Sequence, residues 1–127
     1  MDLHKTDSEF MERFEQFAFD EVVNEKGQQL PEHTRYLVIL ATLIGCGGLD
    51  VYKEMLPKAL DNGMTPIEVK EIVYQATDYL GYGRILAFLH ATNDILSERG
   101  VELPLEGQAT TGSDNRLEKG IEAQAEI

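Results

Sequence analysis

Hydrophobic positions along the chain recur at helical spacing, and no stretch sustains the strict alternation of a half-buried strand. The pattern therefore predicts an all-α protein, a compact bundle of about six helices. Residues 1–8 are expected to form a frayed polar tail. The first predicted helix then repeats aromatic residues every three or four positions, at Phe10, Phe14 and Phe17. Phe19 and Val23 point away from that face. This helix is thus expected to carry a second apolar surface that needs a partner.

The second predicted helix, residues 31–46, contains the most continuous apolar run of the chain. Its segment from Tyr36 to Ile44 is apolar on every side. A helix of this kind must be surrounded, either by the other helices of the chain or by another subunit. Pro31 suits the first helical position, because the N–H that proline lacks would have no partner there.

Three further helices follow, each marked by local signals. The third covers residues 49–60 and contains Pro57, which is expected to bend it. The fourth begins at Thr65-Pro66-Ile67-Glu68, a capping box with proline at the first helical position. Gly81-Tyr82-Gly83-Arg84 breaks that helix, and the fifth helix ends at a Gly100 cap.

These signals divide the chain into a helical domain over residues 9–100 and a C-terminal region over residues 101–127. That region is expected to be a loop and a last helix, capped by Asp114 and weakly apolar through Leu117 and Ile121. The helix could pack on the bundle or on a neighbouring subunit. Alternatively it could begin a second repeat, because residues 116–122 faintly echo residues 13–18.

Composition narrows the possible partners and the compartment. The 127 residues suffice for one core, and 23 acidic against 11 basic residues give a net charge of −12. Such a charge disfavours nucleic acid and anionic membrane surfaces. A single cysteine, an N-terminus without a signal pattern and the lack of a long apolar run predict a cytoplasmic protein.

Strong metal and nucleophile motifs are missing from the sequence. It contains no His-Glu-x-x-His, Cys-x-x-Cys, phosphate-binding glycine loop or Gly-x-Ser-x-Gly. The three histidines, His4, His33 and His90, do not form a ligand pair by their spacing. We therefore expect neither a metal nor a cofactor.

The turn before the fifth helix carries the clearest candidate binding residues. Arg84 follows Gly81-Tyr82-Gly83, where backbone N–H groups and a guanidinium could together hold a carboxylate. Tyr79 and Tyr82 flank the same turn and could donate hydroxyl hydrogens. The simpler alternatives are a surface arginine paired with an acid and two half-buried packing tyrosines.

Three other residues are candidates for proton transfer. Glu71 could act as an acid with a raised pKa if an oligomer covers it, although most such glutamates are solvated. Cys46 could equally be an ordinary buried thiol, and His90 a half-buried structural histidine. The predicted site therefore combines the catalytic candidates Arg84, Glu71, His90 and Cys46 with binding by Tyr79, Tyr82 and Arg84.

The stretch from Leu30 to Leu96 resembles the carboxymuconolactone decarboxylase family, which has the all-α fold of alkylhydroperoxidase D. The similar pieces are Pro31-x-x-Thr-Arg35, Lys58-Ala-Leu-Asp-Asn-Gly-Met-Thr-Pro-x-Glu-Val-x-Glu71 and Tyr79-Leu-Gly-Tyr-Gly-Arg84. The resemblance implies a homo-oligomer, a trimer or hexamer, which would cover the second helix and the surface of Phe19 and Val23.

The resemblance also bears on activity. The peroxidase branch uses a Cys-x-x-Cys pair, a histidine and a glutamate as a proton relay, and by alignment those places hold Gly48, Val51, Met55 and Tyr36 here. Dithiol peroxidase activity is therefore not expected. At the position where the decarboxylases tend to keep a histidine, this chain has Met55. Two hypotheses remain: a lyase acting on a small lactone or carboxylate, and a non-catalytic oligomeric binding or assembly module on the same fold.

Overall fold

The computed structural model describes residues 2–127, so that Met1, part of the predicted tail, lies outside the described residues. Within that range the chain forms helices and no strand, which confirms the predicted all-α class. The elements are α1 (Leu3–Thr6), α2 (Ser8–Gln16), the π-helical turn η1 (Phe17–Glu21), α3 (Val22–Asn24), α4 (Glu32–Gly45), α5 (Leu49–Asp61), α6 (Pro66–Leu80), α7 (Tyr82–Glu98) and α8 (Arg116–Ala125). None of these helices is long and apolar enough to cross a membrane.

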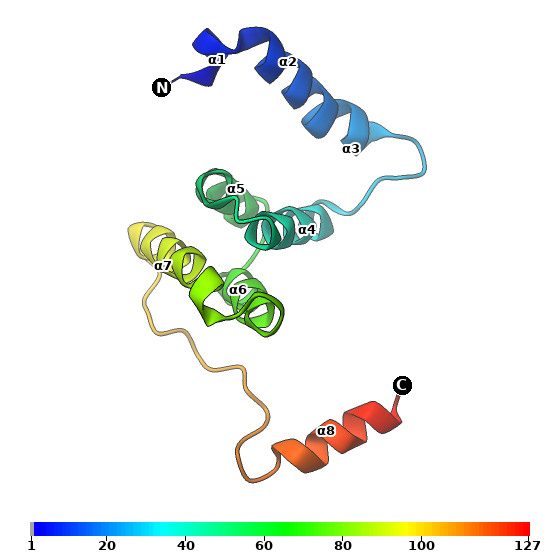
Figure 1. Cartoon of the computed structure of the whole chain (residues 1–127), viewed down its shortest axis with the longest axis vertical. Coiled ribbons are helices and arrows are strands. Elements are labelled where there is room, and N and C mark those ends of the chain that lie inside the picture. The colour runs from blue at the N-terminus through cyan, green and yellow to red at the C-terminus, as the bar shows by residue number, and fades with distance from the viewer. Residues whose placement is uncertain (1) are drawn as a thin grey trace.

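Helices α4 to α7 form the packed centre of the molecule, as Figure 1 shows. Each contacts two of the others, in the pairs α4–α5, α4–α6, α5–α7 and α6–α7. The most deeply buried side chains come from all four helices and include Leu40, Tyr52, Leu56, Val69, Val73, Ile85 and Leu96. The hydrophobic core therefore belongs to these four helices.

A buried polar pair joins α5 to α7 inside this core. The hydroxyl of Thr92 donates to the carbonyl of Phe88 at 2.8 Å, so the phenol of Tyr52 is the donor in its 2.7 Å hydrogen bond to Thr92 Oγ1. Burial raises the pKa of Tyr52, whereas the bond to Thr92 opposes that rise. The Tyr52 and Phe88 rings also meet edge to face, 5.2 Å between centroids. Every polar atom of this pair has a partner, as a buried position requires.

Helix α4 is less enclosed than its sequence predicts. Only Leu40 and Ile44 are fully buried, whereas Val38 keeps 51% of its surface exposed. The helix also begins one residue later than expected, with Pro31 as its cap. The bundle thus covers one side of α4 and leaves an apolar strip open.

The predicted boundaries of the next helices agree closely with the structure. Helix α5 runs through Pro57 without interruption. The capping box at Thr65 and Glu68 forms as expected, with both of its hydrogen bonds present. Gly81 alone separates α6 from α7, because its φ of +82° is a conformation that other residues rarely adopt.

The N-terminal helices extend away from the centre, as Figure 1 shows in blue. The tail contains the helical turn α1, in which the Asp2 carboxylate accepts from the His4 backbone N–H at 3.2 Å. Helices α2 and α3 are continuous through η1, and their aromatic residues stay exposed: Phe10 66%, Phe14 48%, Phe17 60% and Phe19 48%. Phe10, Phe14 and Phe17 form an exposed aromatic face, whereas Phe19 lies near the core, because Lys58 Nζ on α5 is 5.9 Å from the centre of its ring.

The C-terminal region contacts the core at its beginning and extends away from it further along the chain. Val101 and Leu103 pack against the buried residues. Helix α8 then lies apart from the bundle, with Leu117 76% and Ile121 59% exposed. The prediction of Asp114 as its cap is wrong: Asn115 occupies the cap position, and its side chain instead accepts from the Gly112 N–H at 2.8 Å.

Candidate functional site

An apolar groove of about 730 Å³ runs between α4 and α6 and is the largest concavity described. We call it the α4/α6 groove. Its wall on α4 comes from the exposed strip of that helix, and its wall on α6 carries the polar groups. The lining residues are Leu37, Val38, Ala41, Gly45, Glu68, Glu71, Ile72, Gln75, Ala76, Tyr79 and Leu80.

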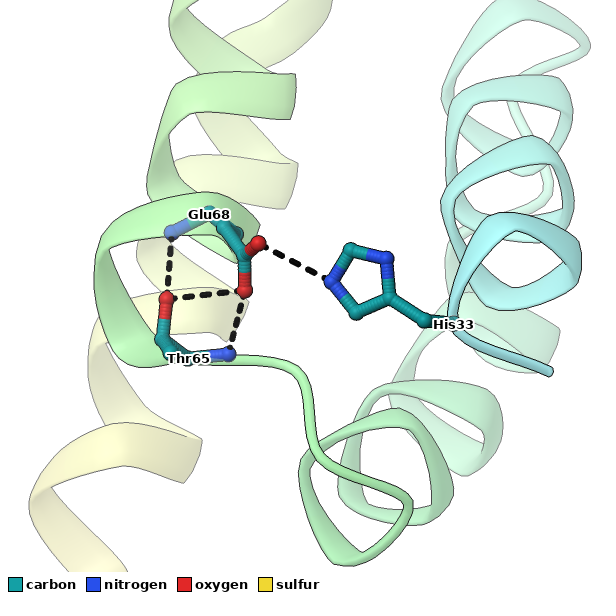
Figure 2. A network of polar contacts seen from close by, with 3 residues as sticks. All are labelled: His33, Thr65 and Glu68. Carbon is teal, nitrogen blue, oxygen red and sulfur yellow. Dashed lines mark hydrogen bonds and ion pairs between the residues drawn. The ribbon is translucent and has the colours of Figure 1, made fainter. Parts of the chain in front are cut away.

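Figure 2 shows a hydrogen-bonded network around Glu68, which lines this groove at the first turn of α6. His33 Nε2 donates to Glu68 Oε1 at 2.9 Å and joins the first turn of α4 to the first turn of α6. The other oxygen of Glu68 accepts from the Thr65 N–H at 2.8 Å and from the Thr65 hydroxyl at 2.9 Å. In return, Thr65 Oγ1 accepts from the Glu68 N–H at 3.2 Å. Both carboxylate oxygens are therefore fixed.

These contacts change the acidity of Glu68. The hydrogen bond from the Thr65 backbone N–H lowers the pKa of the carboxyl most, partial burial opposes it, and the Thr65 hydroxyl and His33 lower it further. A carboxylate that accepts several hydrogen bonds is stabilised in its ionised form. Glu68 is therefore a structural anion and not a proton donor near neutral pH.

Glu71 and Tyr79, two residues of the predicted site, line the α4/α6 groove further along α6. Glu71 is half-buried and accepts only from the Gln75 amide, at 3.5 Å. Tyr79 is 87% exposed at the far end of the groove. Eight residues of helix separate the two, a rise of about 12 Å.

A second concavity, of about 430 Å³, brings Arg84 and Cys46 together at the end of α4. We call it the Arg84 hollow. The glycine-rich turn after α4 provides one wall, and the first turns of α7 provide the other. The residues that line it are Ile44, Gly45, Cys46, Gly47, Leu49, Leu80, Arg84, Ala87 and Phe88.

Arg84 forms no ion pair or side-chain hydrogen bond with any residue between 2 and 127. By contrast, Arg13, Arg35 and Arg99 are each paired with an acid, Glu9, Glu32 and Asp61 respectively. The Cys46 thiol donates only a long sulfur bond to the Leu43 carbonyl, 3.6 Å. The Arg84 hollow thus combines an available cation with a thiol and apolar walls.

The two concavities adjoin, because Gly45 and Leu80 line both of them. Tyr79 lines the α4/α6 groove and not the Arg84 hollow. Tyr82 and His90 line neither concavity. Tyr82 lies two residues before Arg84, a spacing that places side chains on different sides of a helix. His90 is exposed and lies about 9 Å further along α7.

The structure therefore unites part of the predicted site. Arg84 and Cys46 share one hollow, Glu71 and Tyr79 line the adjoining α4/α6 groove, and Tyr82 and His90 face solvent. Within residues 2–127 no three histidine, cysteine or acidic side chains come close enough together to hold a metal ion.

Comparison with known proteins shows the family of the chain. The model of the carboxymuconolactone decarboxylase family matches residues 8–94, from α2 into α7. The chain belongs to the carboxymuconolactone decarboxylase family. A 4-carboxymuconolactone decarboxylase of Acinetobacter baylyi (strain ATCC 33305 / BD413 / ADP1) is 30% identical over 99 residues, which cover 78% of this chain and 72% of that protein. No solved structure gives a significant match.

Sequence reasoning missed the His33–Glu68 contact of this family member. The capping box was visible in the sequence, and it already assigned one role to Glu68. The histidine lies 35 residues earlier in the chain, and no local pattern shows that α4 and α6 start side by side.

Proposed function

We propose that this chain is a lyase of the carboxymuconolactone decarboxylase type that binds a small lactone or carboxylate in the Arg84 hollow. The observation that supports this most is the unpaired Arg84 on an apolar concavity of about 430 Å³ that also contains Cys46. A volume of this order suits a small-molecule ligand with one or two polar anchors. The relative from Acinetobacter baylyi, a 4-carboxymuconolactone decarboxylase, supplies the reaction class.

In this proposal Arg84 holds one carboxylate of the substrate. A guanidinium can make two parallel hydrogen bonds to a carboxylate and thereby fix its orientation. Phe88, Leu80 and Ile44 surround the rest of the molecule with apolar surface. A second carboxylate, pressed against these apolar walls, is poorly solvated and leaves more readily as carbon dioxide.

The leaving step breaks the bond between that carboxylate and its neighbouring carbon. The electron pair stays on the carbon as an enolate, which then needs a proton. Cys46 is the proton donor in the same hollow, and water can reprotonate its thiolate. Tyr79, in the adjoining α4/α6 groove, can donate a hydrogen bond to the enolate oxygen.

The second candidate is a non-catalytic oligomeric binding or assembly module. The observation that favours it is the incomplete convergence of the predicted site, because Glu71, Tyr82 and His90 lie away from the Arg84 hollow. In both cases we propose a homo-oligomer, a trimer or hexamer, because the aromatic face of α2 and the open strip of α4 lack cover.

The test is to incubate the protein with 4-carboxymuconolactone and follow carbon dioxide release. Loss of a charged hydrogen bond of about 1.5–3 kcal/mol predicts that Arg84→Ala lowers kcat/KM by about 10- to 100-fold. Arg84→Lys should recover part of the loss. Arg116→Ala is the matched control, because Arg116 also has no ion pair or side-chain hydrogen bond within residues 2–127 but lies on α8.

Two results decide between the candidates. Carbon dioxide release that depends on Arg84 and not on Arg116 supports the lyase. If the wild-type protein releases none, or if Arg84→Ala is as active as wild type, this site is not that of a 4-carboxymuconolactone decarboxylase.

A further inference from the structure

We propose that a hollow between α6 and the segment after α7 binds a small zwitterion, a molecule that carries both an ammonium and a carboxylate group. The hollow measures about 110 Å³ and lies between the first half of α6 and residues 104–108. We call it the Lys70 hollow. The family model matches residues 8–94 and so does not include one wall of this hollow. The proposal does not rest on the lyase function, because the Lys70 hollow shares no lining residue with the Arg84 hollow.

Lys70 supplies a cation that no acid neutralises. Its Nζ donates to Asn93 Oδ1 on α7 at 2.8 Å and lies 5.4 Å from the centre of the Tyr74 ring. It forms no ion pair with any acid between residues 2 and 127. An ammonium has three N–H donors, so two of them remain for a ligand. Because Asn93 is uncharged, the bond to it fixes the position of the ammonium and leaves its charge uncompensated.

Two acids, Glu71 and Glu106, line the same hollow. The Glu71 carboxylate is half-buried and accepts only from the Gln75 amide, at 3.5 Å. Glu106 forms no ion pair within the described part of the chain, and neither acid is paired with Lys70. The Lys70 hollow therefore presents charges of both signs that are separated from one another.

This separation determines the charge of the ligand. A simple anion would be attracted by Lys70 but repelled by Glu71 and Glu106, and a simple cation would meet the reverse. A zwitterion places each of its charges opposite a charge of the other sign. The carboxylate also has two further donors within reach of the hollow, because the Tyr74 hydroxyl and the Gly107 backbone N–H donate to no other residue described.

The volume and the apolar walls determine the body of the ligand. About 110 Å³ is well below the roughly 300–1,000 Å³ of pockets for drug-sized molecules. Ile67, Pro104 and Leu105 provide the apolar surface. A short aliphatic group fits such walls, whereas a long or aromatic side chain does not fit the volume. The ligand class is therefore a small aliphatic amino acid.

L-Alanine at pH 7 is a suitable probe, and the backbone amide of Gly107 is a built-in reporter. The protein would be labelled with nitrogen-15, and the Gly107 signal assigned with Gly107→Ala. Titration at constant ionic strength should shift this signal saturably in the millimolar range, because a ligand of so few atoms makes few contacts. Gly27, in the turn after α3 and outside the hollow, is the internal control.

Two further probes each lack one of the two charges. Propionate has the carboxylate without the ammonium, and ethylamine has the ammonium without the carboxylate. Each loses a charge-assisted hydrogen bond and keeps the repulsion from the hollow's charge of its own sign. Both should therefore bind at least about tenfold more weakly than alanine.

Variants identify the residues that hold the probe. Lys70→Gln and Glu71→Gln should each weaken alanine binding by about tenfold, and Tyr74→Phe by a smaller factor. Lys53→Gln is the matched control, because this exposed lysine of α5 does not line the hollow. Circular dichroism would verify that each variant is folded. If Lys70→Gln does not fold, Glu71→Gln and Tyr74→Phe carry the test.

Three outcomes would overturn the proposal. The first is no saturable shift of the Gly107 signal at tens of millimolar alanine. The second is binding of propionate or ethylamine as tight as that of alanine. The third is a titration that the folded Lys70→Gln, or Glu71→Gln and Tyr74→Phe together, leave as it is in wild type.

Discussion

The imidazole of His33 and the carboxylate of Glu68 meet at 2.9 Å and tie the first turn of α4 to the first turn of α6. At the other end of the same helices, Gly45 and Leu80 line common concavities. The two helices therefore run in the same direction. Their open faces form one continuous groove, with a fixed anion at its beginning and the Arg84 hollow at its end.

The capping box should contribute measurably to stability. Thr65→Ala removes the hydroxyl that bonds both the Glu68 N–H and the Glu68 carboxylate. We expect the free energy of unfolding to fall by about 1 kcal/mol, as is usual for a lost N-cap. Urea unfolding followed by circular dichroism measures this. Thr42→Ala, an exposed position within α4, is the control and should cause no loss.

Glu68 should also make stability depend on pH in the acid range. Its pKa is lower in the folded than in the unfolded protein, so it stabilises the fold above its unfolded pKa, and that contribution is lost as pH falls through the folded value. Unfolding free energies of wild type and Glu68→Gln should therefore converge between about pH 5 and about pH 2.

The control for this experiment is Glu71→Gln, one turn further along α6, where the carboxylate has only the 3.5 Å contact with Gln75. The difference between wild type and Glu71→Gln should change much less over the same range. A wild-type advantage over Glu68→Gln that stays constant down to pH 2 would show that the Thr65 contacts do not favour the ionised carboxylate.

The exposed aromatic face of α2 should mediate self-association. We expect sedimentation at micromolar concentration to give a mass several times the 14.3 kDa of one chain. Phe10→Ser should shift the distribution to smaller species, because Phe10 is 66% exposed and stacks on Phe14, 6.1 Å between ring centroids. Val51→Ser, at a position 49% exposed on α5, is the comparison. A monomeric wild-type protein would refute the proposed assembly.

Local signals predicted the helices well, because each boundary depends on a few neighbouring residues. The capping box at Thr65 and the break at Gly81 formed where the sequence places them. Two helix starts differ from the prediction by one residue: Pro31 is the cap of α4 and not its first residue, and Asn115, not the adjacent Asp114, is the cap of α8. The family resemblance, seen in the sequence, is likewise confirmed.

The candidate site was only partly predictable. Arg84 and Cys46 were each chosen for their own chemistry, yet their place in one hollow depends on how α7 crosses the end of α4. The same reasoning placed Tyr82 with Arg84 because it flanks the same turn, and added His90 as a candidate for proton transfer. Their positions on other parts of α7 separate them, since direction changes by more than a quarter turn with each helical residue.

By itself, the sequence determined the all-α class, the helix boundaries and the family, because these follow from hydrophobic period, caps and motifs that act over a few residues. Only the tertiary structure decided which polar groups meet: His33 with Glu68, Arg84 with Cys46, and Tyr36 with Asn62. Such meetings depend on the packing direction of whole helices, and that direction is set by the sum of many core contacts that no short stretch of sequence contains.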